Sequence, residues 1–295
     1  MVRKWPVVGN SVIPIPDEFI ESAFRRESEI LSYRKPRYSN RLSCLVDSRL
    51  VVCPDERLTI SRFEPTLLEN HTLYNLYAAL GLPCDVLDIL PRGVWKICPA
   101  CIRDDINEYG VAFIHRMWAF PRAKCCIKHG FKLQDKCPVC DVTAKRHNFL
   151  DYYKCSRRRK FCDRLSPESM FLESSIFFDD LLQNATCPAS FARVRGAVYT
   201  SLLEQGYGAH GVNAVGAEID KLAVYNELIG TFGLKLVAHK WLGDEFDSLS
   251  CVNVAFLAFR NISNFRERLE KVADDNCLAA IRARFLVFHS DMFWC

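Results

Sequence analysis

The sequence lacks any long hydrophobic run. No apolar stretch approaches the roughly 20 consecutive residues that a membrane-spanning helix requires. The first residues, MVRKWPVVGNSVIPIP, do not contain the continuous apolar segment of a secretory signal. We therefore expect a soluble, cytoplasmic protein with no membrane partner.

Signatures of several enzyme classes are missing as well. The sequence has no His-Glu-x-x-His pair, no Gly-x4-Gly-Lys-Ser/Thr phosphate loop and no Gly-x-Ser-x-Gly elbow. Nucleobase deaminases need a His-x-Glu before their Cys-x-x-Cys element, but His71, the one histidine before Cys98, is followed by Thr and Leu. Acidic pairs such as Asp104 and Asp105 are more typical of solvated surface than of nuclease metal sites. We expect no catalytic residues and a protein that is not an enzyme.

Apolar residues and cysteines are plentiful. Hydrophobic residues make up 49% of the 295-residue chain and charged residues 25%, which is the composition of a folded protein with a substantial core. Eight of the 15 cysteines lie between Cys98 and Cys162. Such crowding in a large chain without a secretory signal favours metal binding over disulfides.

The hydrophobic pattern predicts a mainly α-helical fold. Apolar residues at helical spacing indicate one helix near residues 17–33 and another over 65–80, bounded by a proline and a glycine. We expect an N-terminal helical domain (1–93), a tandem zinc-binding module (94–165) and a C-terminal helical domain (166–295). A helix-turn-helix in the C-terminal domain is left open.

Four residues have the spacing of a closed zinc site. Cys98-Pro-Ala-Cys101 is followed after 24 residues by Cys126-Ile-Lys-His129. Three thiolates and one imidazole complete a tetrahedron and leave no position for a catalytic water. Cys125 could compete with its neighbour, but only Cys126 has the two-residue spacing to His129.

A second group follows directly. Cys137-Pro-Val-Cys140 is followed by Cys155 and Cys162, which predicts a four-thiolate site with a widely spaced last pair. His147 could replace one of these cysteines, and metal at the first site alone is the alternative. We expect two Zn²⁺ ions per chain.

Positive charge gathers in the same region. Residues 96–164 carry 16 Lys and Arg against 7 Asp and Glu, so this segment has a net charge of +9 while the rest of the chain has −5. A polyanion is the expected partner. Within the second cysteine group, a basic run flanked by Tyr152, Tyr153 and Phe161 is the candidate phosphate-binding segment. This run consists of Arg157, Arg158, Arg159 and Lys160. A solvated loop, or one that binds an acidic protein, is the alternative.

The ordered string WKICPACIRDDINEYGVAFIHRMWAFPRAKCCIKHGFKLQDKCPVC resembles the central signature of the TniQ/TnsD family, and the resemblance covers about residues 95–162. It implies a bacterial adaptor that selects target sites for a Tn-type DNA transposon and recruits a transposon AAA+ ATPase of the TnsC/TniB kind. Relatives bind DNA directly or join a CRISPR guide-RNA effector complex. A protein- or RNA-binding zinc adaptor with no DNA contact is the alternative function, and a homodimer is left open.

Overall fold

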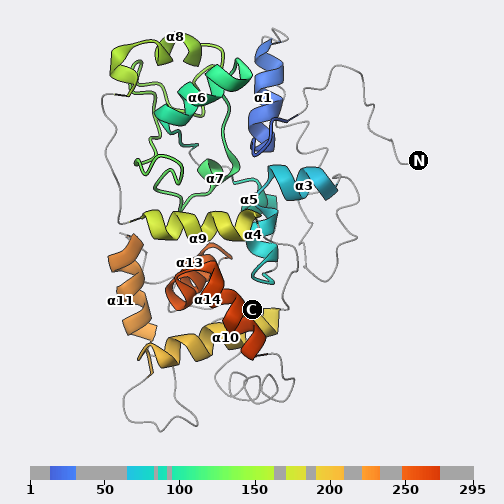
Figure 1. Cartoon of the computed structure of the whole chain (residues 1–295), viewed down its shortest axis with the longest axis vertical. Helices are drawn as coiled ribbons and strands as arrows, with labels where there is room; N and C mark the ends of the chain where they lie inside the picture. Colours follow the sequence, from blue (N-terminus) through green and yellow to red (C-terminus); the bar gives the residue numbers. More distant parts are fainter. Residues whose placement is uncertain are drawn as a thin grey trace, which may run out of the picture. The chain divides into compact units, whose positions relative to one another are not determined.

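A computed structural model describes eight segments of the chain (Figure 1). These segments are residues 14–30, 65–82, 86–91, 95–162, 171–183, 191–208, 221–232 and 248–272. Their regular structure is helical, without a strand longer than an isolated β-bridge. The expectation of a mainly α-helical fold is confirmed.

The described residues divide between two compact units. Unit 1 contains α1 (Ile20–Ile30), α3 (Pro65–His71), α6 (Pro99–Tyr109), α7 (Arg116–Ala119), α8 (Tyr152–Ser156) and the 3-10 helix η1 (Arg159–Phe161). Unit 2 contains α4 (Tyr74–Ala78), α9 (Leu172–Gln183), α10 (Phe191–Glu204), α11 (Lys221–Phe232), α13 (Ser248–Phe259) and α14 (Ile262–Lys271). The short α5 (Val86–Ile89) spans the division.

This division differs from the three blocks expected from the sequence. The helices α1 and α3 share a unit with the cysteine-rich segment, whereas α4 belongs with the C-terminal helices. The helix expected over 65–80 is also interrupted, between α3 and α4. Here the Thr72 hydroxyl donates to the Leu68 carbonyl (2.5 Å) and the Leu73 amide donates to the Ile89 carbonyl (3.1 Å). These bonds replace the pairing that a continuous helix would need.

An aromatic column supports unit 1. The Trp95 ring stacks on Phe149, with 6.2 Å between centroids, and meets the edge of Phe19 just before α1. Tyr152, which is fully buried on α8, also contacts Phe149, with 6.4 Å between ring centroids. The column thus joins the residues at the start of the N-terminal helix to the cysteine-rich segment.

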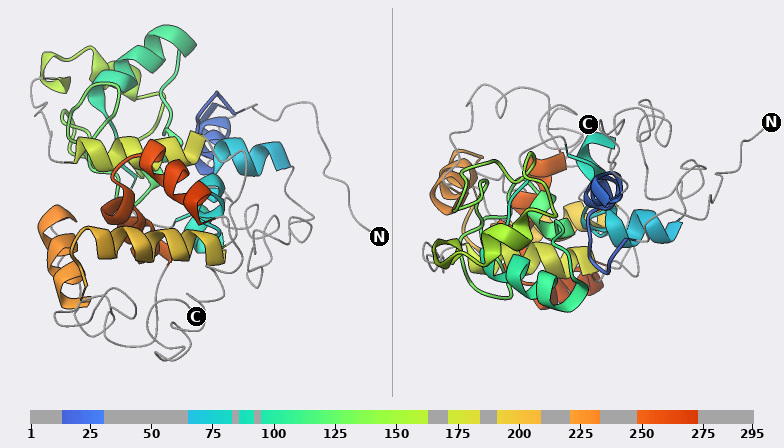
Figure 2. Two further views of the ribbon diagram at one scale, coloured as in Figure 1. Left: turned by 60° about the horizontal axis from the view of Figure 1, so that its bottom comes forward. Right: turned by 90° about the horizontal axis from the view of Figure 1, so that it is seen from above.

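Unit 2 packs around α13, whose residues 251–259 are all buried. Phe256 of this helix contacts Phe177 and Phe178 of α9 and Phe232 of α11. The helices α10 and α14 pack against α13, and the left view in Figure 2 shows them beside it. No helix in the described segments has the length and apolar character needed to cross a membrane.

Candidate metal centres

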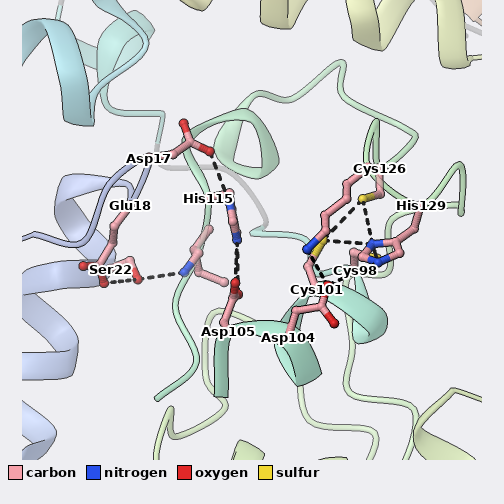
Figure 3. A network of polar contacts seen from close by, with 12 residues as sticks. Asp17, Glu18, Ser22, Cys98, Cys101, Asp104, Asp105, His115, Cys126 and His129 are labelled. Carbon is pink, nitrogen blue, oxygen red and sulfur yellow. Dashed lines mark hydrogen bonds and ion pairs between the residues drawn. The ribbon is translucent and has the colours of Figure 1, made fainter. Parts of the chain in front are cut away.

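The first cluster joins the start of α6 to a tight turn. Cys98 is the N-cap of α6, Pro99 opens the helix and Cys101 lies in its first turn. Proline suits this position because its fixed φ is helical and its missing N–H would have no partner there. Cys126 and His129 complete the group, and their side chains converge on the two helix cysteines (Figure 3).

The geometry of this cluster fits a tetrahedral ion. His129 Nδ1 lies 3.6 Å from Cys98 Sγ, 3.1 Å from Cys101 Sγ and 3.7 Å from Cys126 Sγ. The Cys101 and Cys126 sulphurs are 3.5 Å apart. Zinc bound at its usual distances would place such atoms roughly 3.6–3.8 Å apart. The four residues that the spacing predicted are therefore brought together as one potential ligand set, and Cys125 is not part of it.

The electrostatics of the cluster favour a cation. The contact with Cys101 lowers the pKa of Cys126, and the same contact raises the pKa of Cys101. One thiolate is thus already favoured, next to the positive end of α6. The Asp104 carboxylate lies 3.4 Å from His129 Nε2, on the side of the ring away from the sulphurs, and also pairs with Lys128. A carboxylate in this place fixes the ring so that Nδ1 faces the ion.

The second cluster contains Cys137, Cys140, His147 and Cys155, whose ligand atoms lie within 4.8 Å of one another. Cys162, the fourth ligand expected from the sequence, is outside this set. His147, the alternative left open above, takes its place. The reason is local: Cys155 lies on α8, and the chain passes through η1 before it reaches Cys162. Each of the two clusters could hold one metal ion.

The orientation of His147 is fixed on both sides. Its Nδ1 donates to the Asn148 carbonyl (2.7 Å), so Nε2 is the nitrogen with a free lone pair, and this atom lies 3.5 Å from Cys155 Sγ. Its ring stacks on Tyr152 with 3.8 Å between centroids. The two histidines therefore present different nitrogens, Nδ1 in the first cluster and Nε2 in the second.

Two turns of the same backbone form each supply two of the four residues of one cluster. The Cys126 amide donates to the Phe131 carbonyl (2.8 Å) and the Gly130 amide donates back to the Cys126 carbonyl (2.7 Å). Cys137 repeats both bonds with Val142 and Asp141, at 2.8 and 2.9 Å. The residue after the second ligand is left-handed in both turns, with φ of 65° at Gly130 and 59° at Asp141. Each cluster therefore contains one turn of the same backbone form, here called a knuckle, at residues 126–130 and 137–141.

A charged network that sequence reasoning missed links α6 to the segment before α1. His115 lies between two carboxylates, with Nδ1 3.1 Å from Asp17 and Nε2 3.1 Å from Asp105 (Figure 3). Burial disfavours the imidazolium, but these two hydrogen bonds outweigh it and raise the pKa of His115 to about 9. At neutral pH His115 is therefore a partly buried cation that ties α6 to the N-terminal residues.

A second buried network begins one residue later. Glu18, fully buried, accepts two hydrogen bonds from the Arg26 guanidinium (3.0 and 2.7 Å) and one from the Ser22 hydroxyl (3.1 Å). Ser22 in turn accepts the Ile114 amide at 2.9 Å. The spacing of Glu18, Ser22 and Arg26 places all three on one face of a helix, and this is the signal that could have revealed the network.

A lysine fixes the loop before the first knuckle. Lys96 Nζ donates to the carbonyls of Phe120 (3.1 Å), Pro121 (2.8 Å) and Ala123 (2.6 Å). Burial lowers the pKa of Lys96 to about 7, and Lys124 acts in the same direction. These three bonds hold residues 120–123 beside the residues that lead into α6.

The basic run lies on the surface beside the second cluster. All four of its side chains are exposed, on the end of α8 and on η1. The aromatic flank differs from expectation, because Tyr152 and Phe161 are fully buried and only Tyr153 is exposed. The Arg157 guanidinium lies over the Tyr153 ring, 4.1 Å from its centroid. Arg103 of α6 reaches the Ser156 carbonyl (3.4 Å) and adds a further cation next to the run.

Comparison with known families identifies the first part of this architecture. Residues 12–133 match the family model for TniQ. The chain carries a TniQ domain. The TniQ match includes α1, both buried networks and the whole first cluster, and it ends before Cys137. It confirms the resemblance seen in the sequence over residues 95–133 and indicates a role associated with transposon target-site selection. No curated protein is significantly similar in sequence to this TniQ-domain chain.

Proposed function

We propose that this protein is a zinc-stabilised adaptor that selects target DNA for a bacterial Tn-type transposon and recruits its AAA+ ATPase. The TniQ domain is the observation that carries the proposal. Zinc is the metal that best suits both clusters, because each offers three thiolates and one imidazole. Four protein ligands leave no open position on the ion, so we propose a structural role for the metal and no catalytic one.

The basic run is the proposed DNA contact. Arg157, Arg158, Arg159 and Lys160 are exposed together on a segment whose backbone is anchored by the neighbouring second cluster. A fixed array of cations suits the phosphate backbone, which contributes affinity without reading sequence. Arg103 and Tyr153 would widen the contact at its edge.

The test is the binding of zinc-loaded full-length protein to random duplex DNA across a salt series. We compare the wild type with a variant in which Arg157, Arg158 and Arg159 are all replaced by Gln. If each arginine neutralises one phosphate, the slope of log K against log salt becomes shallower by about 2–3. A control that replaces Arg266, Arg268 and Lys271 of α14 by Gln removes the same charge and should leave the slope unchanged. An unchanged slope in the first variant would remove the basic run from the interface.

The second candidate is an adaptor that docks on a guide-RNA effector complex or another protein without touching DNA. The same basic run favours it, because guide RNA presents phosphates too. Zinc-loaded wild type that fails to bind duplex DNA at low salt, but binds the effector complex, would support this function over the first. Recruitment of the AAA+ ATPase is common to both candidates, and co-purification with the ATPase of the same transposon tests it.

A further inference from the structure

The second cluster lies outside the residues that match TniQ, yet α1, which lies inside them, is bound to it. Arg25 of α1 donates through one guanidinium nitrogen to the His147 carbonyl (2.7 Å) and through the other to the Lys145 carbonyl. Glu29, one turn further along α1, accepts the Phe149 amide at 2.6 Å. The two side chains thus hold the backbone of residues 145–149, which present the ligand His147.

The two α1 side chains also hold each other. Arg25 Nε and Glu29 Oε1 are 2.9 Å apart, and both side chains are largely buried, with exposed fractions of 14% and 12%. The Arg25 guanidinium lies 5.2 Å from the Phe149 ring centroid and 5.8 Å from that of Trp95. Ordering and desolvating such a buried pair costs free energy, which its hydrogen bonds must offset. Apart from the bond within the pair, these hydrogen bonds are directed at one loop.

That loop is held partly by hydrogen bonds to neighbouring residues, and two of its carbonyls bind α1. Within residues 145–149, the His147 amide pairs with the Thr143 carbonyl, while the carbonyls of Lys145 and His147 point to Arg25. The position of His147 Nε2 relative to Cys155 depends on this backbone, because the ring is already held by Asn148 and Tyr152. A shift of α1 would therefore be passed to the ligand atom.

We infer that Arg25 and Glu29 are positioning residues for the second metal site, and that occupancy of this site and docking of α1 are coupled. The inference rests on the metal binding proposed above for the second cluster, but not on DNA targeting. Because coupling is reciprocal, loss of metal from this site loosens α1, and loss of the α1 contacts weakens the site. The functional domain then extends past the TniQ match to the end of the second cluster.

The two histidine ligands allow each site to be followed separately in the full-length protein. The chain has seven histidines, and the two ligands have opposite tautomers, so long-range proton–nitrogen spectra of the imidazoles should distinguish His129 from His147. The zinc-loaded protein is titrated with EDTA, and the chelator concentration at which each ligand signal is lost is measured. His129 serves as an internal reference for global unfolding.

In Arg25→Met, the zinc affinity of the second site should fall about 10-fold, while that of the first site should change less than about twofold. Tenfold is the lower end of the loss seen when a residue that hydrogen-bonds and orients a metal ligand is removed. Arg25→Lys should recover part of the loss because it keeps a cation that can donate to one carbonyl. Arg260→Met is the matched control, since Arg260 also lies over a ring (Phe256) and faces a carboxylate (Glu227), but in unit 2.

The outcomes separate this inference from the proposed zinc sites. A wild-type His147 signal that does not respond to zinc would overturn both. A wild-type His147 signal that responds to zinc, with the same EDTA midpoint in Arg25→Met as in the wild type, would overturn only the role of α1. Equal weakening of both sites in Arg25→Met would also overturn it, because the residue would then act on the unit as a whole.

Discussion

Stability of unit 1 should fall as the pH rises through the range in which His115 loses its proton. Two features of the surroundings stabilise the protonated form of His115. The imidazole bridges the carboxylates of Asp17 and Asp105, and its ring lies against Phe113 and Trp118, with 4.6 and 4.2 Å between centroids. Both carboxylates and aromatic faces favour the imidazolium. The side chain is 22% exposed, so solvent screens these interactions only weakly.

The magnitude follows from the pKa. The pKa of His115 is raised from 6.5 to about 9, and a difference of this size corresponds to about 3 kcal/mol of stabilisation. Because the folded-state pKa lies above the unfolded value, this stabilisation is fully present below pH 6.5 and is lost as the pH rises through 9. Burial raises the pKa of Asp105, which means that folding with this carboxylate ionised has a cost in free energy. The net stabilisation from the whole network is therefore smaller than the contribution of His115 alone.

The assay compares zinc-loaded wild type with His115→Gln by urea unfolding between pH 6 and 10, while imidazole spectra of the wild type report the pKa of His115 directly. The wild type should be more stable than the variant by up to about 3 kcal/mol at the acid end, and the difference should shrink by about 1.4 kcal/mol per pH unit between the two pKa values. Effects of the cysteine ligands cancel, because both proteins contain them. A difference that stays constant with pH, or a His115 pKa near 6.5, would refute the reasoning.

Three further predictions concern unit 1. Cys98→Ser should abolish metal binding at the first cluster and unfold unit 1, since structural zinc contributes on the order of 10 kcal/mol, and zinc content with circular dichroism checks this. Gly130→Ala should cost about 1–2 kcal/mol because of its positive φ, whereas Asp141→Gly in the equivalent position should be neutral or stabilising; urea unfolding compares them. Glu18→Gln should cost about 3–5 kcal/mol by leaving Arg26 buried without its counter-ion, and the same variant in an Arg26→Met background should cost much less.

Sequence reasoning located the first metal cluster completely because its ligands come in two pairs, and each pair is fixed by a short turn. The second cluster shows the limit of spacing. Cys137 and Cys140 follow from the repeated knuckle, but the choice between His147 and Cys162 depends on the path of the chain through α8 and η1. The loop that presents His147 is also bound by α1, more than 100 residues away in the sequence.

The helix α13 was not predicted from the sequence, for a different reason. Periodicity reveals a helix with one apolar face, but α13 is buried along residues 251–259 on every side and so has no polar stripe to mark its period. The network around His115 was missed because Asp17, Asp105 and His115 come from three separate segments. By contrast, α1 was found near its true limits, because its outer residues are more polar than those that pack in unit 1.

Within unit 1, the two proposed metal sites hold different segments of the chain. The first cluster fixes α6, and the His115 network ties α6 to the residues before α1. The loop that Arg25 and Glu29 bind presents His147 to the second cluster. The helix α1 and the residues before it are therefore bound to segments of both clusters, and the exposed basic run begins two residues after Cys155 of the second cluster. Under the proposed metal binding, a partner that binds this run is linked, through His147 and Arg25, to α1 of the TniQ domain.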